Sequence, residues 1–458
     1  MAFDIILRDG NVFYGGELHR TSIGIKDGII TAIGSIEEIG GYNTINLHGK
    51  LVIPGGVDPH THIEGYSSAG TIKNGTTGAA IGGTTTVLDF SQATENEDTV
   101  RAAESKIKRF SEQSPLDFTV KPMMVTADFE SEEKLEGIFM GLQKSGIMAV
   151  KLFTTYKNLG RYANNYQILM AMRIARKHGI MVQVHAENND FIEGNMVALL
   201  RAGKTGPVYH ARSKPDISED VAVADAAIAA RESGSKVYCV HLSTKNSPEI
   251  IDMARKNGTD IYGETCPQYL ILDEEYLNGD RGNEYICSPP LRKKSDIDAM
   301  WNALASGKIH AVGSDHVPFL REQKKPGMPF NKVPNGVPGI ETRLPLLFSE
   351  GVQKGRITLQ KFVDLISSGP ARIFGLYPRK GTIDIGSDAD IAVIDTEMEH
   401  GLRAEDLHMG TDISLYGHIK TRGWPVLTLA GGKIVAENDV FIETGRRGKF
   451  LGKGGIDE

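Results

Sequence analysis

Two histidines lie one residue apart in the stretch VDPHTHIEG (57–65), directly after the apolar run LVIPGG. In an extended chain, side chains at positions i and i+2 point to the same side. His60 and His62 therefore face one point at the end of a short buried strand. Imidazole ligands that converge in this way suit zinc, manganese or a similar divalent ion.

Four further polar side chains lie at the ends of other short apolar runs. These are Lys151 in MAVKLF, His185 in VQVHAEN, His241 in YCVHLS and Asp315 in AVGSDHVP. A single histidine at a strand end is more often structural than a metal ligand, and the other nine of the thirteen histidines receive that interpretation. The joint placement of four histidines and one aspartate predicts a metal site.

Lys151 is the unusual member of this set, because a protonated ammonium cannot bind a metal ion. It lies among apolar residues in GIMAVKLFTTY, where an unpaired charge is costly. Neighbouring dications would lower its pKa and expose a neutral amine. Such an amine could take up carbon dioxide to give a carbamate, an anion that can bridge two metal ions.

Eight short apolar runs alternate with helix-like stretches and must position these residues. The runs span residues 51–60, 82–90, 116–125, 146–153, 179–187, 235–243, 258–266 and 308–316. Residues 166–179 and 218–234 show helical periodicity, the second after a Ser-Glu-Asp cap signal, and both end on glycine. The pattern predicts an α/β protein with a (β/α)8 TIM barrel, in which catalytic groups lie at the C-terminal ends of the strands.

The first fifty residues and the region near the C-terminus have a different sequence pattern, in which strand-like runs alternate with glycine-containing turns. We expect the N-terminal runs to form a small antiparallel sheet and both terminal regions to pair into one small β-sandwich. The predicted domains are residues 1–53 (sandwich, first part), 54–376 (catalytic barrel), 377–440 (sandwich, second part) and 441–458 (tail). The polar, glycine-rich tail is expected to be disordered or to form an oligomer arm that docks on a neighbouring subunit.

Composition excludes several other classes of protein. The net charge of −7, with a pI near 6.0 and no basic stripe, argues against a nucleic-acid partner. The N-terminus lacks the pattern of a signal peptide, and no apolar stretch is long enough to span a membrane. Three cysteines without metal-type spacing fit buried thiols in a reducing cytoplasm.

The motifs DPHTHI, AVKLFTTY, QVHAEN, CVHLS, ICSPPLR, GSDHVPF, VPNGVPGIE and GTIDIGSDADIAVID occur in this order along the chain. Together they resemble the D-hydantoinase and dihydropyrimidinase family, the cyclic-amidase branch of the amidohydrolase superfamily. The resemblance covers essentially the whole chain. It implies a binuclear zinc site with a carboxylated lysine at Lys151, and a homo-oligomer, a tetramer by resemblance.

The resemblance also assigns roles to individual residues. The more buried metal would be held by His60, His62, Lys151 and Asp315, and the more exposed one by Lys151, His185 and His241. Tyr156 and the backbone around Ser288 and Asn335 would hold the substrate ring. Two metals would hold a bridging hydroxide that attacks the ring carbonyl. Asp315 would move the proton to the leaving nitrogen and Tyr156 would donate to the oxyanion, giving an N-carbamoyl amino acid.

Related branches differ at a few positions. The dihydroorotase-like pattern has an arginine after the H-x-H motif, whereas this chain has Ile63-Glu64-Gly65, which disfavours an acidic substrate. Allantoinase-like members lack the tyrosine that KLFTTY supplies here as Tyr156. We therefore expect hydantoins or dihydropyrimidines as substrates. An allantoinase- or dihydroorotase-like cyclic amidase, a hydrolase of unrelated esters and a non-catalytic scaffold relative remain alternatives.

The walls of the predicted pocket depart from the family pattern. Residues 63–83 are shorter than the family pattern implies and lack its acidic run. The other walls are expected at residues 91–98 and 154–163. Tyr66 and Leu159 could line a pocket for an apolar ring substituent, or could be exposed loop residues.

Overall fold

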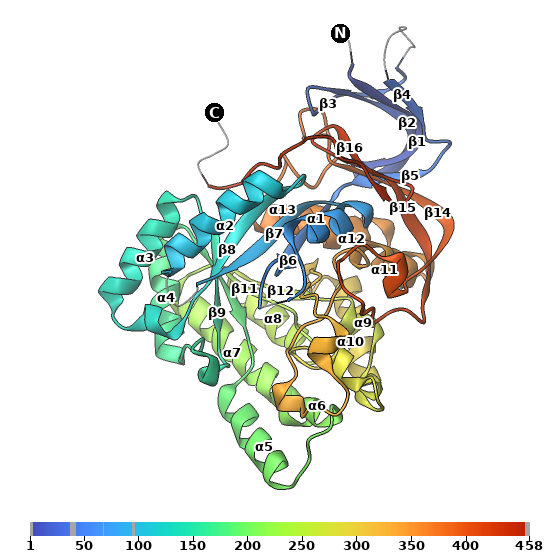
Figure 1. Cartoon of the computed structure of the whole chain (residues 1–458). Helices are drawn as coiled ribbons and strands as arrows, with labels where there is room; N and C mark the ends of the chain where they lie inside the picture. The colour runs from blue at the N-terminus through green and yellow to red at the C-terminus, as the bar shows by residue number, and fades with distance from the viewer. Residues whose placement is uncertain (1–2, 37–42, 67, 94–96, 454–458) are drawn as a thin grey trace.

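The computed structural model describes residues 3–36, 43–66, 68–93 and 97–453. Eight parallel strands form one sheet in sequence order (Figure 1), as the alternation of apolar runs and helices predicted. A parallel bridge between Thr61 and His316 joins the first strand to the segment after the last, so the sheet closes into a barrel. The strands are β6 Gly56–Thr61, β7 Thr84–Gln92, β8 Asp117–Met123, β9 Ala149–Phe153, β10 Met181–His185, β11 Val237–Cys239, β12 Ile261–Thr265 and β13 Ala311–Val312.

Helices cover the outside of the barrel (Figure 1). The helices are α1 Ile72–Ile81, α2 Thr99–Gln113, α3 Glu132–Lys144, α4 Asn165–His178, α5 Asn189–Arg201, α6 Val208–Ser213, α7 Asp216–Ser233, α8 Ser247–Lys256, α9 Gln268–Ile271, α10 Lys294–Ser306, α11 Arg343–Leu347, α12 Leu359–Val363 and α13 Gly369–Ile373.

The two helices expected from periodicity are α4 and α7. Both end on a glycine in the left-handed conformation, Gly179 with φ 63° and Gly234 with φ 65°, as their sequences indicated. The Ser-Glu-Asp cap prediction for α7 was wrong. The helix begins earlier, at Asp216, and Ser218 donates its hydroxyl back to the carbonyl of Pro215 instead of capping the helix end.

Strands from both chain ends form a second, mixed sheet beside the barrel, at the upper right of Figure 1. Its members are β1 Ile5–Tyr14, β2 Glu17–Lys26, β3 Ile29–Gly34, β4 Asn43–Asn46, β5 Leu51–Pro54, β14 Ile391–Gly401, β15 Lys420–Ala430, β16 Lys433–Glu437 and β17 Val440–Phe441. The side chains of Ile5, Val52, Val393 and Leu429 share one hydrophobic core, which ties the two chain ends together.

The prediction of a purely antiparallel N-terminal sheet was wrong. β1 pairs in parallel with both β4 and β5, while β14 pairs antiparallel with β5. These pairings join segments that are distant in sequence, so no local turn signal reveals them. β5 belongs to this sheet and β6 to the barrel, and only Gly55 separates them.

The described part of the C-terminal tail packs against its own barrel, and the prediction of an oligomer arm stays a prediction. Phe118 of β8 donates its backbone N–H to Lys449 and accepts one from Leu451. Arg446 forms an ion pair of 2.6 Å with Asp117. These contacts satisfy backbone groups and a buried carboxylate, so they hold this part of the tail on the barrel. Residues 454–458 lie outside the described part of the chain.

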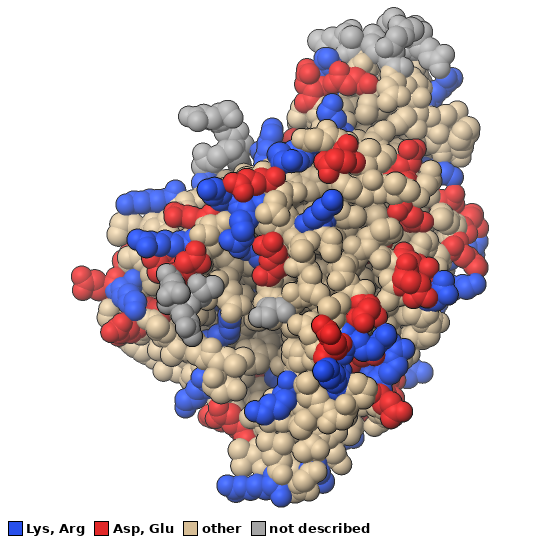
Figure 2. Space-filling view, in the orientation of Figure 1, with Lys and Arg blue, Asp and Glu red and all other residues tan. Residues whose placement is uncertain are grey.

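The surface of this view carries lysine and arginine interspersed with aspartate and glutamate (Figure 2). Cys239, Cys266 and Cys287 are buried and free, as their spacing predicted. Within the described residues, no helix combines the length and the apolar character that crossing a bilayer requires.

Candidate active site

The histidine pair of β6 points to one place, as its alternation predicted. Nε2 of His60 and Nε2 of His62 lie 3.2 Å apart, and both rings are buried. Asp58 fixes this segment, because its Oδ1 accepts the backbone N–H groups of His60 at 3.2 Å and of Ser314 at 3.1 Å. The first strand is thereby tied to the segment that follows the last strand.

Lys151 and Asp315 meet the same pair of imidazoles. Nζ of Lys151 lies 3.0 Å from Nε2 of His60. Oδ1 of Asp315 lies 3.0 Å from Nε2 of His60 and 3.4 Å from Nε2 of His62. The side chains of the first strand, of β9 and of the segment after the last strand therefore lie in contact with one another.

His185 and His241 form the adjoining part of the cluster. Their ring centroids lie 4.5 Å apart, and the ring of His241 is 5.3 Å from that of His60. One potential ligand atom from each of His60, His241 and Asp315 lies within 4.8 Å of the others. Nε2 of His185 donates to the Glu187 carboxylate at 2.8 Å, which leaves the lone pair of Nδ1 to bind a metal ion. The structure thus brings together all six residues predicted as ligands.

The chemistry of this donor set fits divalent cations. Nδ1 of His62 and Nδ1 of His241 are buried without a hydrogen-bond partner among the described residues. Burial, with Lys151 nearby, holds the pKa of His62 well below its usual range, and burial with His185 nearby does the same for His241. Neutral imidazoles carry a free lone pair on one ring nitrogen, and lone pairs that converge in this way suit a metal ion.

Lys151 is also suited to the chemistry that its position requires. Its side chain is buried, and Nζ lies 4.5 Å from the centre of the Phe90 ring. Burial lowers the pKa of Lys151 to about 8, although Asp315 and Glu264 pull it upwards. An appreciable fraction of the amine is therefore neutral near pH 8, even before any cation is considered.

Glu264 on β12 supports the cluster and was missed in the sequence. Its carboxylate accepts from Tyr238 at 2.7 Å and from the backbone N–H of His241 at 3.1 Å, and it lies 2.7 Å from Nδ1 of His60. A side chain at Gly313 would meet both His60 and the Glu264 carboxyl within 3.0 Å, so this close approach requires glycine. The only signal in the sequence was an acidic residue inside the apolar run IYGET.

Three residues with predicted catalytic or ligand roles have left-handed backbone conformations, which are costly for residues other than glycine. They are Tyr156 with φ 64°, His241 with φ 41° and Asp315 with φ 47°. Strain of this kind persists where the surroundings fix it and often marks functional sites. All three residues lie in the loops that follow their strands, and all three line the same cavity.

A cavity of about 220 Å³ opens onto the cluster. It is lined by His62, Tyr66, Lys151, Phe153, Tyr156, Leu159, Arg161, His185, His241, Ser288, Asp315, Val317, Phe319, Pro334, Asn335 and Gly336. The three residues predicted to hold substrate are all in this wall. Oγ of Ser288 and Oδ1 of Asn335 are buried and have no hydrogen-bond partner among the described residues. The serine hydroxyl can donate to a ligand or accept from it, whereas the amide oxygen of Asn335 can only accept.

The remaining wall predictions have mixed outcomes. Tyr66 and Leu159 line the cavity, and Tyr66 donates its hydroxyl to the sulfur of Met123 at 2.9 Å. Segment 154–163 contributes Tyr156 and also Arg161, which the sequence analysis did not single out. No described residue of segment 91–98 lines the cavity, and residues 94–96 of that segment lie outside the described part of the chain.

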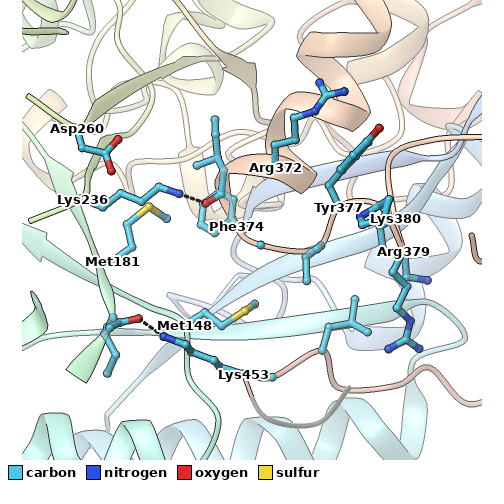
Figure 3. Close-up of a pocket in the computed structure, with 18 of the residues that line it drawn as sticks. Met148, Met181, Lys236, Asp260, Arg372, Phe374, Tyr377, Arg379, Lys380 and Lys453 are labelled. Atoms are coloured by element: carbon cyan, nitrogen blue, oxygen red, sulfur yellow. Dashed lines mark hydrogen bonds between the residues drawn. The ribbon is translucent and has the colours of Figure 1, made fainter. Parts of the chain in front are cut away.

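A second, larger cavity of about 610 Å³ lies at the other end of the barrel (Figure 3). Met148 and Lys236 in its wall precede strands β9 and β11, and Lys453 of the tail borders it. Its wall contains no histidine. Lys380 in this wall is held by Asp117 and Asp390, so it is not free to react. The smaller cavity, at the C-terminal ends of the strands, is therefore the candidate active site.

Comparison with known proteins gives extensive similarity. The model of the amidohydrolase family matches residues 51–435. A D-hydantoinase of Geobacillus stearothermophilus is 36% identical over 97% of this chain and 96% of its own length. The crystal structure of a D-hydantoinase aligns with a TM-score of 0.93 at 36% identity, covering 98% of both chains. That of dihydropyrimidinase from Brevibacillus agri aligns with a TM-score of 0.91 at 34% identity, covering 99% of both.

Proposed function

The chain belongs to the amidohydrolase family, and we propose that it opens a hydantoin or dihydropyrimidine ring to give an N-carbamoyl amino acid. The similarity to D-hydantoinases over nearly the whole chain confirms the resemblance that the motifs indicated, and the chain is a cyclic amidohydrolase. Six potential metal ligands converge on one cavity and support the hydrolysis. The observation that carries the choice of ring is the pair of polar atoms in the cavity wall that have no hydrogen-bond partner among the described residues. Those atoms, on Ser288 and Asn335, suit the amide edge of a small ring.

Two divalent cations, which we propose to be zinc, would be held by His60, His62, Lys151, His185, His241 and Asp315. When bound, such a pair supplies Lewis acidity and lowers the pKa of a water molecule between the ions. Lys151 would serve as the bridging ligand after its neutral amine adds to carbon dioxide and releases one proton. Its burial and its lowered pKa support that modification.

The protein's own groups then have distinct tasks. Asp315 accepts the proton of the attacking water and delivers it to the ring nitrogen, so that the C–N bond breaks and the water oxygen remains in the new carboxylate. Burial would raise the pKa of Asp315, but His60 and His62 outweigh it and hold the pKa well below its usual range. Asp315 is therefore ionised and ready to accept at neutral pH.

Tyr156 acts on the opposite atom of the reacting carbonyl. Its ring lies 5.2 Å from the ring of His185, in the wall of the cavity. Burial, with the Glu187 carboxylate nearby, raises the pKa of Tyr156 well above its usual range, so the phenol keeps its proton. It donates a hydrogen bond to the carbonyl oxygen as negative charge develops there.

The proposal extends to assembly and compartment. We propose a homotetramer in the cytoplasm, by analogy with the family and because three buried free thiols suit a reducing environment. The scaffold alternative is disfavoured, since every predicted ligand position carries a residue able to bind metal. Metal analysis of the purified protein distinguishes the two.

A substrate panel tests the function. Zinc-loaded protein is assayed with hydantoin, 5-phenylhydantoin, dihydrouracil, allantoin and dihydroorotate, and ring opening is followed by chromatography of the N-carbamoyl product. We expect ring opening of hydantoin or dihydrouracil. Exclusive turnover of allantoin or of dihydroorotate would assign the chain to one of those related branches, and no turnover of any ring would overturn the proposal.

A further inference from the structure

Arg161 is a buried cation that lines the catalytic cavity without a carboxylate partner. Its side chain is 6% exposed. Among the described residues, its guanidinium has one recorded acceptor, the sulfur of Met123 at 3.8 Å, and no carboxylate within ion-pair distance. Burial of an unpaired charge is costly, and a guanidinium carries five N–H donors. Arg161 therefore has unused capacity for an anion.

Two aromatic rings hold Arg161 beside the metal-binding cluster. Its Cζ lies 5.4 Å from the centre of the Tyr66 ring and 5.7 Å from that of Phe153. The Tyr66 ring is 4.9 Å from the ring of His62, and the Phe153 ring is 5.4 Å from that of His185. The Tyr66 ring therefore lies between the guanidinium and His62, and the Phe153 ring lies between the guanidinium and His185.

The backbone around Arg161 is fixed on both sides. Thr126 donates its N–H to the carbonyl of Gly160 at 2.8 Å and its hydroxyl to that of Tyr162 at 3.0 Å. Ala163 donates to the carbonyl of Phe153 at 2.9 Å, which returns the loop to the end of β9. The arginine is thus held in place before any ligand binds, which reduces the entropy cost of binding.

The other charged groups near the cavity leave Arg161 available. Asp315 is the one carboxylate among the described lining residues, and the catalytic cluster occupies it. Glu64 follows the histidine pair but forms an ion pair of 3.3 Å with Arg109 and does not line the cavity. The acidic residue after the H-x-H motif therefore does not place a negative charge in the pocket.

From this arrangement we infer that Arg161 binds an anionic group on the ring of the substrate. The preferred substrates are cyclic amides that carry a carboxylate on a short arm, which a guanidinium can hold with two parallel hydrogen bonds. A cavity of about 220 Å³ suits a small ring with a short arm. The inference rests on the proposed ring-opening function. It departs from the expectation of a neutral substituent, because the arginine comes from the loop after β9 instead of from the H-x-H motif.

A matched pair of substrates tests the inference without any mutation. Hydantoin-5-acetate and hydantoin-5-acetamide have nearly the same shape and differ in charge. We expect the wild-type protein to open the acetate with a kcat/KM about 10- to 100-fold higher than the acetamide, the range for a charged hydrogen bond. Equal or lower values for the acetate would overturn the inference and leave the proposed function standing.

Variants of Arg161 then test whether this residue causes the preference for the acetate. Arg161→Gln should lower the acetate-to-acetamide ratio of kcat/KM towards one, and Arg161→Lys should give an intermediate ratio, since it keeps the charge but loses the planar fork. Arg173→Gln removes the same charge from an exposed position on α4, paired with Glu232 at 3.4 Å, and should keep the wild-type ratio. A ratio that Arg161→Gln leaves unchanged would overturn the role of Arg161.

A binding measurement separates failure of the proposed function from failure of the anion site. If neither compound is opened, binding of hydantoin-5-acetate is measured by titration calorimetry with the zinc-loaded wild type and with Arg161→Gln. Weaker binding by the variant, about 10- to 100-fold, would support the anion site on its own. Equal binding would overturn the site together with the function.

Discussion

Oε1 of Glu264 lies 2.7 Å from Nδ1 of His60, and both side chains are completely buried. This contact fixes the orientation of the imidazole and directs Nε2 towards the predicted metal centre. The same carboxylate holds the backbone N–H of His241. Glu264 therefore positions two ligands that come from different strands, although it is not predicted to touch the metal itself.

Glu264→Gln should weaken metal binding by about 10- to 100-fold, the usual effect of removing a partner that orients a ligand. The dissociation constant is measured by competition with a chelator. Glu341→Gln provides a matched control, since it changes a buried carboxylate that bonds to His408 away from the cavity. Equal zinc affinity in the Glu264→Gln variant and the wild type would contradict the positioning role.

Lys151→Ala should lose most of the bound metal and most of the activity. Alanine has no amine and so cannot form the carbamate that we propose as the bridging ligand. Metal content is measured together with activity, and small carboxylic acids should restore part of both by replacing the carbamate. Growth with 13C-bicarbonate should give a carbamate signal in the wild type that is missing from the variant. Wild-type enzyme that is active without metal would refute the model.

Asp315→Asn should lower kcat by roughly 10²–10⁴, the usual contribution of general acid–base catalysis. Asparagine keeps an oxygen near Nε2 of His60 but cannot accept the proton. The assay requires a metal count for the variant, so that loss of zinc is separated from loss of proton transfer. Near-normal kcat with both metals bound would remove Asp315 from this role.

Much of the barrel and of its ligands could be predicted from the sequence for a physical reason. Strands of a parallel sheet are buried on both faces, so they appear as short apolar runs, and polar residues at their ends are conspicuous. His60 and Asp315 could be found in this way, although more than two hundred residues separate them. Closure of the barrel then brings such strand ends together.

Glu264 and Arg161 could not be found by the same reasoning. Glu264 lies inside a strand, and one sequence does not say whether a polar side chain there faces the barrel interior or a helix. Arg161 follows β9 in a loop whose return to Phe153 depends on contacts with Thr126, which is distant in sequence. The parallel pairing of β1 with β5 was hidden for the same reason, because it is a non-local contact.

Lys380 joins the barrel to the terminal sheet, and its removal should destabilise the protein in a pH-dependent way. Its ammonium lies 2.5 Å from Asp117 of β8 and 2.8 Å from Asp390, next to β14. Loss of one partner of a buried ion pair costs roughly 3–5 kcal/mol. Lys380→Met should therefore lower the free energy of unfolding at neutral pH by about that amount, as measured by denaturant titration.

The pH dependence follows from Asp117. Burial would raise its pKa, but Lys380 and Arg446 hold the pKa well below the usual 3.8. A carboxyl with a depressed pKa stabilises the fold fully above its unfolded pKa and loses that contribution as the pH falls. The difference in stability between the wild type and Lys380→Met should therefore shrink below about pH 4. Lys177→Met, which removes an exposed pair with Glu136, should have little effect at any pH. A difference that is constant between pH 7 and pH 3 would contradict this assignment.

Tyr156→Phe separates a transition-state role from a binding role, because it removes the hydroxyl and keeps the aromatic surface. The ring packs 5.9 Å from Phe153, and these contacts remain in the variant. If the phenol donates to the developing oxyanion, kcat should fall by roughly 10²–10³, the usual cost of one such donor. KM should change little, since that hydrogen bond forms mainly in the transition state. Both constants are measured on the same substrate with a metal count for each protein. If kcat is intact, or only KM rises, then Tyr156 is a binding surface and another group must stabilise the oxyanion.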